Sequence, residues 1–228
     1  MQIIYEDEQL LVVYKEAGLA TQTARLGQPD LVSEVKNHIF RNSGDKNPYI
    51  GLINRLDQPV EGLVLFGKNA KVTARLNEYL QQNKIQKYYY ALVYGIRSQH
   101  QEELIHYLEK DKKTNLSKVV REKSKDAKKA CLEYQVLCER DGCQLVNIHL
   151  KTGRHHQIRV QFSVTGTPLV GDSKYGSQES ISFGKLHKVV SPALCAYRLE
   201  LPHPKDGKMM TFQIEPKHPM MGDIVNEL

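Results

Sequence analysis

Residues 131–150 read CLEYQVLCERDGCQLVNIHL, and this stretch decides the fold class. Residues 131–137 are rich in side chains that favour β-strands, and residues 144–150 alternate apolar and polar side chains. Asp141-Gly142 between them is typical of a tight β-turn. The sequence therefore predicts two consecutive antiparallel strands joined by a short turn.

Other apolar segments extend this pattern in both directions. A second hairpin is predicted at residues 2–5 and 10–14, and further strands at 63–66, 88–94, 194–201 and 210–214. Helical spacing of apolar residues predicts helices at 30–41, 72–80 and 155–164, with Asp30 and Asn69 as caps of the first two. Strands outnumber helices and follow one another in pairs. We therefore predict an α+β fold with a largely antiparallel sheet, as a single domain over residues 1–228.

Composition places the chain among ordinary globular proteins, because 40% of its 228 residues are hydrophobic and 25% are charged. Its apolar runs fall far short of the roughly 20 residues of a membrane-spanning helix. The acidic start Glu6-Asp7-Glu8 does not fit a secretory signal. We expect a cytoplasmic protein with no membrane partner, with its four cysteines reduced. No metal site is expected, because no cysteine or histidine spacing is typical of zinc ligands.

Positive charge is concentrated in one segment. Residues 110–129 hold nine Lys and Arg against three Asp and Glu, a net charge of +6 that equals the net charge of the whole chain. Such a segment attracts a polyanion such as nucleic acid. The alternative is a solvated loop that only keeps the protein soluble, and charge by itself does not decide between them.

Two polar clusters interrupt the apolar pattern, and the first is NRLDQPVEG at residues 54–62. Pro59 and Gly62 favour a turn directly before the strand expected at 63–66. Asp57 therefore lies on a loop held by rigid elements, where functional residues concentrate, and it is a candidate catalytic carboxylate. A surface turn with an ion pair between Arg55 and Asp57 is the alternative.

The second polar cluster is KTGRHHQIR at residues 151–159, which leads from a strand into the helix expected at 155–164. The first turn of a helix exposes unpaired N–H groups, and Arg154 and Arg159 add positive charge. The cluster therefore predicts an anion site. The exposed polar face of an amphipathic helix is the alternative.

Three motifs in order show which family the chain resembles. The cluster NRLDQPVEG is similar to the HRLDxxTSG motif of the RluA-type pseudouridine synthases. The family motif KxYxAxVxG is matched from Lys87 to Gly95, and TGRxHQIRV is matched from Thr152 to Val160. GxPLVGD follows at residues 166–172 and YG at 175–176. The chain resembles this family from end to end.

The resemblance implies a pseudouridine synthase catalytic fold with a central RNA-binding cleft, and isomerisation of specific uridines in ribosomal RNA or tRNA. It implies Asp57 as the essential carboxylate, acting as nucleophile or general base, with Arg159 as its cationic partner. Tyr89 would stack on the target base, and Leu169 and Val170 would form an apolar wall that excludes water. No cofactor and no metal are implied, because the reaction involves neither redox change nor group transfer.

The resemblance also implies how RNA is held. The target uridine must leave the stacked RNA, and Arg55 is placed to fill the vacated space or to grip a phosphate. The residues expected to hold the flanking RNA are Arg154, His155, Gln157, Lys123, Lys125, Lys128 and Lys129. RNA is the expected partner and the protein is expected to be a monomer. The small S4-type RNA-binding domain that many relatives carry at the N-terminus is expected to be missing.

Four positions depart from the family pattern. Asn54 replaces the usual His, Val60 and Glu61 replace Thr-Ser, and Glu16 stands where Lys-Pro is usual. These departures leave open a non-catalytic RNA-binding protein, such as a ribosome-assembly factor with the same fold. A metal-dependent hydrolase of RNA is a further alternative, and it would need carboxylate and His ligands that converge on one site.

Overall fold

The chain folds into two compact units. The computed structural model describes residues 1–23, 27–225 and 227. Unit 1 comprises Met1–Gln86 and Ala196–Ile214, and unit 2 comprises Lys87–Cys195 and Glu215–Leu228. That residues 1–228 act as one catalytic domain stays a prediction. In the described residues, no helix is long and apolar enough to cross a membrane.

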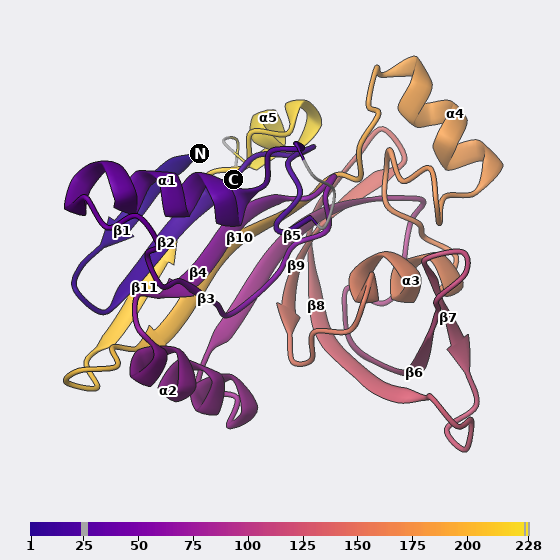
Figure 1. Ribbon diagram of the computed structural model, residues 1–228. Coiled ribbons are helices and arrows are strands. Elements are labelled where there is room, and N and C mark those ends of the chain that lie inside the picture. The colour runs from indigo at the N-terminus through magenta and orange to yellow at the C-terminus, as the bar shows by residue number, and fades with distance from the viewer. Residues whose placement is uncertain (24–26, 226, 228) are drawn as a thin grey trace. The chain divides into compact units, whose positions relative to one another are not determined.

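Unit 1 is built on a sheet in which β1, β2, β4 and β10 are neighbours in that order (Figure 1). The predicted hairpin at the N-terminus is confirmed, because β1 pairs antiparallel with β2. β2 pairs antiparallel with β4, β3 pairs antiparallel with β4, and β11 pairs antiparallel with β10. These strands are β1 (Gln2–Glu6), β2 (Leu10–Lys15), β3 (Gly51–Leu52), β4 (Glu61–Gly67), β10 (Leu194–Pro202) and β11 (Met209–Gln213).

Both helices of unit 1 begin at the predicted caps. The side chain of Asp30 accepts a hydrogen bond from Ser33 N at the start of α1 (Leu31–Ser43). The side chain of Asn69 accepts one from Val72 N at the start of α2 (Ala70–Gln81). Each cap satisfies a backbone N–H that the first helical turn leaves unpaired.

The helix α2 covers one face of the sheet of unit 1. Its Val72 and Leu76 pack with alternate residues of three strands, which are Leu10, Val12, Leu63, Leu65, Leu199 and Leu201. Because side chains alternate along a strand, Leu11 and Val13 point to the opposite face, and both are fully buried. Burial on both faces fixes β2 and its neighbour β4, into which the loop of Asp57 leads.

Unit 2 contains a second run of neighbouring strands, in the order β5, β9, β8, β6 and β7. The hairpin predicted at residues 131–150 is confirmed as β8 and β9, and Asp141 (φ 53°) and Gly142 (φ 72°) form its turn. β6 and β7 were not predicted from the sequence. The strands are β5 (Gln86–Tyr94), β6 (Gln101–Asp111), β7 (Leu116–Val120), β8 (Lys128–Arg140) and β9 (Cys143–Leu150).

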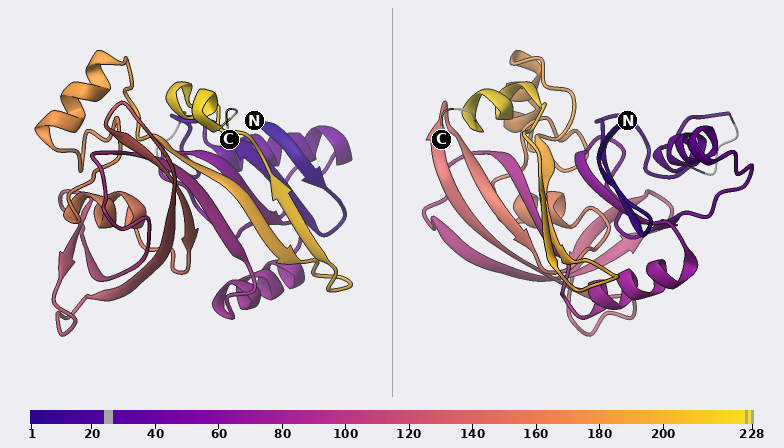
Figure 2. Two further views of the ribbon diagram at one scale, coloured as in Figure 1. Left: turned by 180° about the vertical axis from the view of Figure 1, so that it is seen from behind. Right: turned by 90° about the vertical axis from the view of Figure 1, so that its left-hand side faces the viewer.

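The helix α3 (Gln157–Val164) lies inside the curve of β6, β7 and β8 (Figure 2). It begins two residues later than predicted, because His156 adopts a left-handed conformation (φ 54°) that a helix does not continue. Its Val160 packs with Leu108 of β6 and Ala130 of β8. The strands of unit 2 therefore hold the helix that carries the second polar cluster.

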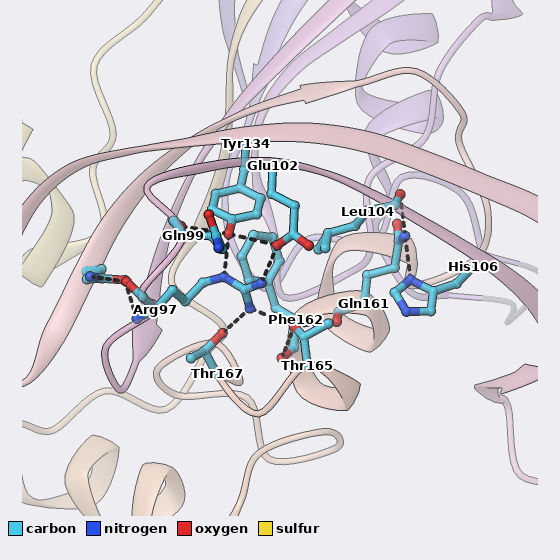
Figure 3. Close-up of polar contacts among 11 residues, drawn as sticks. Arg97, Gln99, Glu102, Leu104, His106, Tyr134, Gln161, Phe162, Thr165 and Thr167 are labelled. Carbon is cyan, nitrogen blue, oxygen red and sulfur yellow. Dashed lines mark hydrogen bonds and ion pairs between the residues drawn. The ribbon is translucent and has the colours of Figure 1, made fainter.

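A polar network ties the C-terminal end of α3 to the strands of unit 2 (Figure 3). Arg97 donates from Nε to Tyr134 Oη (2.7 Å) and from Nη1 to Thr165 Oγ1 (2.8 Å). Its guanidinium also lies over the ring of Tyr134 and forms an ion pair with Glu102 (3.0 Å). Because Thr165 directly follows α3, the network fixes the C-terminal end of the helix. The N-terminal turn of the helix belongs to the second polar cluster, residues 151–159.

Two further helices of unit 2 were not predicted, α4 (Gln178–Leu186) and α5 (Pro219–Val225). Both are short, and α4 buries only Ser180 and Gly184, so it has no apolar stripe for periodicity to detect. The basic segment 110–129 is not a loop throughout. It spans the end of β6, a turn, all of β7, a second turn at residues 121–127 and the start of β8.

Candidate active site

The loop of Asp57 is held on both sides by side chains of unit 1. Asn54 donates from Nδ2 to Leu63 O (3.1 Å) and accepts at Oδ1 from Leu65 N (2.8 Å), so its amide pairs with the backbone of β4. Thr21 Oγ1 donates to Leu56 O (2.7 Å) and accepts from Leu56 N (3.2 Å). Asp57 is half-buried and Arg55 is exposed. The loop therefore presents Asp57 from a fixed backbone.

Lys15 lies buried at the end of β2 and supports the same loop. Its Nζ donates to three backbone carbonyl oxygens, those of Glu16 (3.0 Å), Leu19 (2.7 Å) and Gln58 (3.1 Å). Burial lowers the pKa of Lys15 to about 8, and the negative charges of Asp57 and Glu61 oppose that shift. The ammonium thus joins β2, the following turn and the residue next to Asp57.

Glu61 is also buried in this region, and its Oε2 accepts a hydrogen bond from Tyr14 Oη. The next residue, Gly62 (φ 132°), has no room for a side chain, because a Cβ there would lie 2.5 Å from the backbone of Ala196. Tyr14, Lys15 and Glu61 thus form a buried polar group behind the Asp57 loop. Glu61, one of the departures from the family pattern, has a structural role in it.

The second polar cluster forms the turn between β9 and α3. Gln157 is buried and its amide is used within the turn: Oε1 accepts from Thr152 Oγ1 (2.7 Å) and from Arg154 N (3.0 Å), and Nε2 donates to Cys131 O (3.1 Å). Arg154 is exposed and donates from Nε to Lys129 O (2.8 Å). The turn therefore joins the start of α3 to the basic segment.

Two neighbouring histidines directly precede this helix. His155 Nδ1 lies 2.9 Å from Ser117 Oγ of β7, and the ring of His155 stacks on that of His156 at 3.7 Å. Tyr175 Oη accepts a hydrogen bond from Ser117 N (2.8 Å) and lies 2.7 Å from His156 Nδ1. Both contacts attach β7, the central strand of the basic segment, to the start of α3.

Arg159 is buried in unit 2 beside Asp172. Its Nε and Nη2 donate to the two carboxylate oxygens of Asp172 at 2.6 and 2.7 Å, and its guanidinium lies 5.1 Å from the centre of the Tyr175 ring. This two-point pairing fixes the plane of the guanidinium. The expected partnership of Arg159 with Asp57, which belongs to the other unit, stays a prediction.

Tyr89 lies buried on β5, opposite Ile148 of β9. On the same strand, Val93 bridges Leu169, and Val170 N donates to Leu92 O (2.9 Å). Leu169 and Val170 are completely buried. Leu169 and Val170, the predicted apolar wall, thus lie against β5, the strand that carries Tyr89.

A model of the family described as RNA pseudouridylate synthase matches residues 9–164, more than half of the chain. The chain belongs to this family. A ribosomal large subunit pseudouridine synthase C of Rickettsia felis is 32% identical over 184 residues, covering 80% of this chain and 58% of that protein. A dual-specificity RNA pseudouridine synthase RluA of Vibrio cholerae is 28% identical over 219 residues, covering 92% of this chain and 81% of that protein.

Solved structures confirm the predicted fold of the synthase. Human RNA pseudouridylate synthase domain containing 4 superposes with a TM-score of 0.78 at 21% identity, covering 97% of this chain and 91% of that one. The α+β class and the resemblance to RluA-type synthases are thus confirmed, and with them the class of enzyme, an RNA uridine isomerase. The non-catalytic alternative gains no support from these relatives.

All nine basic side chains of the segment 110–129 are exposed in the synthase. Within the described residues, only Lys118 among them forms an ion pair, with Glu109 at 3.6 Å. Lys123, Lys125, Lys128 and Lys129 therefore present uncompensated charge to solvent. No group of three or more His, Cys, Asp or Glu in the described part of the synthase is arranged to hold a metal ion.

The sequence assigned no role to three buried charged residues, which are Lys15, Lys87 and Asp172. Lys15 and Lys87 are charged residues within β-strands and are buried, which sequence periodicity does not distinguish from exposed positions. Asp172 ends the GxPLVGD motif, and this position was the available signal for a partner of Arg159.

Proposed function

We propose that this synthase isomerises uridines of ribosomal RNA to pseudouridine with Asp57 as the essential carboxylate. The observation that carries the assignment of Asp57 is that its loop is fixed by side-chain hydrogen bonds to the backbone. Asn54, Thr21 and Lys15 donate these hydrogen bonds. A rigid backbone keeps a catalytic side chain in a productive position. The choice of ribosomal RNA follows the name of the Rickettsia relative, and tRNA is the second candidate substrate.

In the proposed reaction, the bond between N1 of uracil and C1′ of the ribose breaks, and the base turns while bound. C5 then forms a bond with C1′, the proton on C5 is lost, and N1 gains a proton. Asp57 acts at the sugar as nucleophile or as general base. The atoms of uridine and pseudouridine are the same, so the balance requires neither cofactor nor metal.

The other site residues have supporting roles in this proposal. Tyr89 stacks on the target base, and Leu169 and Val170 keep water from the broken glycosidic bond. Arg159, oriented by Asp172, holds the Asp57 carboxylate ionised.

The RNA around the target is held by positive charge. Arg55 is exposed beside Asp57, where it fills the space that the flipped nucleotide leaves or grips a phosphate. Arg154, His155 and the exposed lysines at 123, 125, 128 and 129 hold the flanking backbone. Gln157 contributes by shaping the turn of Arg154, with its amide bonded within the protein. The protein acts as a monomer in the cytoplasm, where ribosomal RNA is available.

The test uses total RNA from a strain that lacks this gene, incubated with purified protein without added metal. Pseudouridine is detected as carbodiimide-dependent stops in primer extension. New stops with the natural protein support the proposal and locate the target in ribosomal RNA or tRNA. Tight RNA binding without any new stop would contradict the isomerase activity.

A further inference from the structure

Lys87 is a buried lysine of unit 2 that no group in the described part of the chain neutralises. It lies on β5 and is 7% exposed, and its ammonium group makes no hydrogen bond or ion pair within the described residues. Lys87, Tyr89 and Ala91 alternate with less buried residues along β5 and so share one face of the strand. The side chain of Lys87 therefore lies on the same face of β5 as Tyr89, the tyrosine of the proposed reaction.

The turn between β9 and α3 lies next to this ammonium group. A Cβ placed on Gly153 would be 3.9 Å from Lys87 Nζ, so the ammonium group lies next to a residue of this turn that has no side chain. The neighbouring Arg154 adds a second positive charge, and its Nη atoms make no hydrogen bond within the described residues. The site thus has two cations and a short stretch of backbone without a side chain.

The charges around Lys87 are unfavourable in the free protein. Burial lowers the pKa of Lys87 to about 8, and the charge of Arg154 lowers it further in the same direction. No carboxylate contributes to its shift. A buried cation without a partner is costly, so an arrangement of this kind is suited to a ligand that brings negative charge.

We propose that Lys87 and Arg154 together bind a phosphodiester group of the RNA that flanks the target uridine. A phosphodiester supplies one negative charge to the ammonium of Lys87, while the Nη groups of Arg154 suit a second phosphate oxygen. Successive residues on one face of a strand are roughly 7 Å apart, which places this phosphate beside the base that Tyr89 contacts. The inference rests on the proposed function, because that function supplies the RNA and the role of Tyr89.

The first test measures binding of a fluorescent single-stranded oligouridine RNA over a range of salt concentrations. Lys87→Met is expected to weaken binding roughly tenfold or more and to reduce the salt slope by about one. Lys151→Met is the matched control, because Lys151 lies in the same turn but pairs with Glu133 at 2.9 Å. The control is expected to change affinity less than about threefold. Equal affinity and equal salt slope in Lys87→Met and the natural protein would overturn the proposal.

The second test observes Lys87 itself in the natural protein, by NMR of labelled lysine side chains. The RNA is expected to raise the pKa of Lys87, because a bound phosphate favours the charged form. Inorganic phosphate at the same concentration is expected to have a much smaller effect. An equal response to inorganic phosphate would assign the site to free phosphate, and an absent response to RNA would also overturn the proposal.

Neither test depends on turnover, so the two proposals fail separately. Natural protein that forms no pseudouridine would contradict the proposed function even if Lys87 binds RNA. Natural protein that isomerises uridine while Lys87→Met binds RNA normally would contradict the phosphate site and leave the proposed function standing.

Discussion

Lys15 in unit 1 and Lys87 in unit 2 are both buried, and burial lowers the pKa of each to about 8. Their surroundings are opposite. Lys15 donates to three carbonyl oxygens and lies in the negative field of Asp57 and Glu61. Lys87 has no acceptor within the described residues and is repelled by Arg154.

The difference distinguishes a buried lysine that stabilises the fold from a buried lysine that is suited to bind a ligand. The acceptors of Lys15 belong to the backbone around Asp57, so its charge stabilises the loop in the free protein. The ammonium group of Lys87 gains a partner only when an anion binds. The unpaired buried charge therefore destabilises the free protein, and binding of an anion removes this destabilisation. Substitution of the two lysines should therefore change stability in opposite directions.

The largest effect is expected for Lys15→Met. The change leaves buried carbonyl groups without a donor and removes the cation near Glu61, so the free energy of unfolding should fall by about 3–5 kcal/mol. Urea unfolding followed by circular dichroism measures this. Lys118→Met, at an exposed ion pair, serves as control and should cost less than about 1 kcal/mol. A loss of the same small size in Lys15→Met would remove the contrast between the two lysines.

Exposed lysines provide a third kind of cation for the comparison. Replacing Lys123, Lys125, Lys128 and Lys129 together by Gln should weaken RNA binding roughly a hundredfold and reduce the salt slope by about three. The free energy of unfolding should stay nearly unchanged, because these side chains are exposed. If the salt slope did not change, the segment 110–129 would serve solubility alone.

Lys87→Met should raise the free energy of unfolding by about 1 kcal/mol. Methionine has a similar length and fills the same space without the cost of an unpaired buried charge. Urea unfolding of the free protein measures the gain, and the same variant should bind RNA more weakly. Destabilisation by this substitution would mean that Lys87, like Lys15, has a structural role.

The smallest effect is a pH dependence of RNA binding. With a pKa of about 8 in the free protein, Lys87 loses its proton as the pH rises through 8, whereas the RNA complex holds that proton. Affinity should therefore fall above pH 8 by less than about tenfold per pH unit. Lys87→Met should show a flatter profile in this range, because ordinary lysines stay charged to about pH 10. Parallel profiles for the two proteins would contradict the role of Lys87.

The sequence predicted the parts of the fold that local chemistry determines. Asp30 and Asn69 cap their helices through their own side chains, and Asp141-Gly142 adopts the positive φ angles that its turn requires. β6 and β7 were missed because burial along them does not follow polarity: Ile105 and Val119 are exposed, whereas Ser117 is buried. Their position depends on the pairing of β6 with β8 and on the packing of both strands against α3, which are not local.

The sequence motifs predicted which residues belong to the candidate site. They did not predict the hydrogen bonds and ion pairs that hold these residues. Asp57, Tyr89 and Arg159 were identified from the family pattern, whereas the pairing of Arg159 with Asp172 depends on the fold of the intervening chain. Asn54 was a departure without a stated role, and its two hydrogen bonds to β4 supply one. Lys15 and Lys87 are both single lysines within β-strands, and their different surroundings arise only from the folded chain.

The most direct test of the whole account is the Asp57→Asn variant, assayed with RNA from the strain that lacks the gene. The substitution keeps the size of the side chain and removes its charge, so fold and RNA affinity should stay close to those of the natural protein. The account predicts that the natural protein produces new carbodiimide-dependent stops and that Asp57→Asn produces none. The same stops with Asp57→Asn would contradict the assignment of Asp57 as the essential carboxylate.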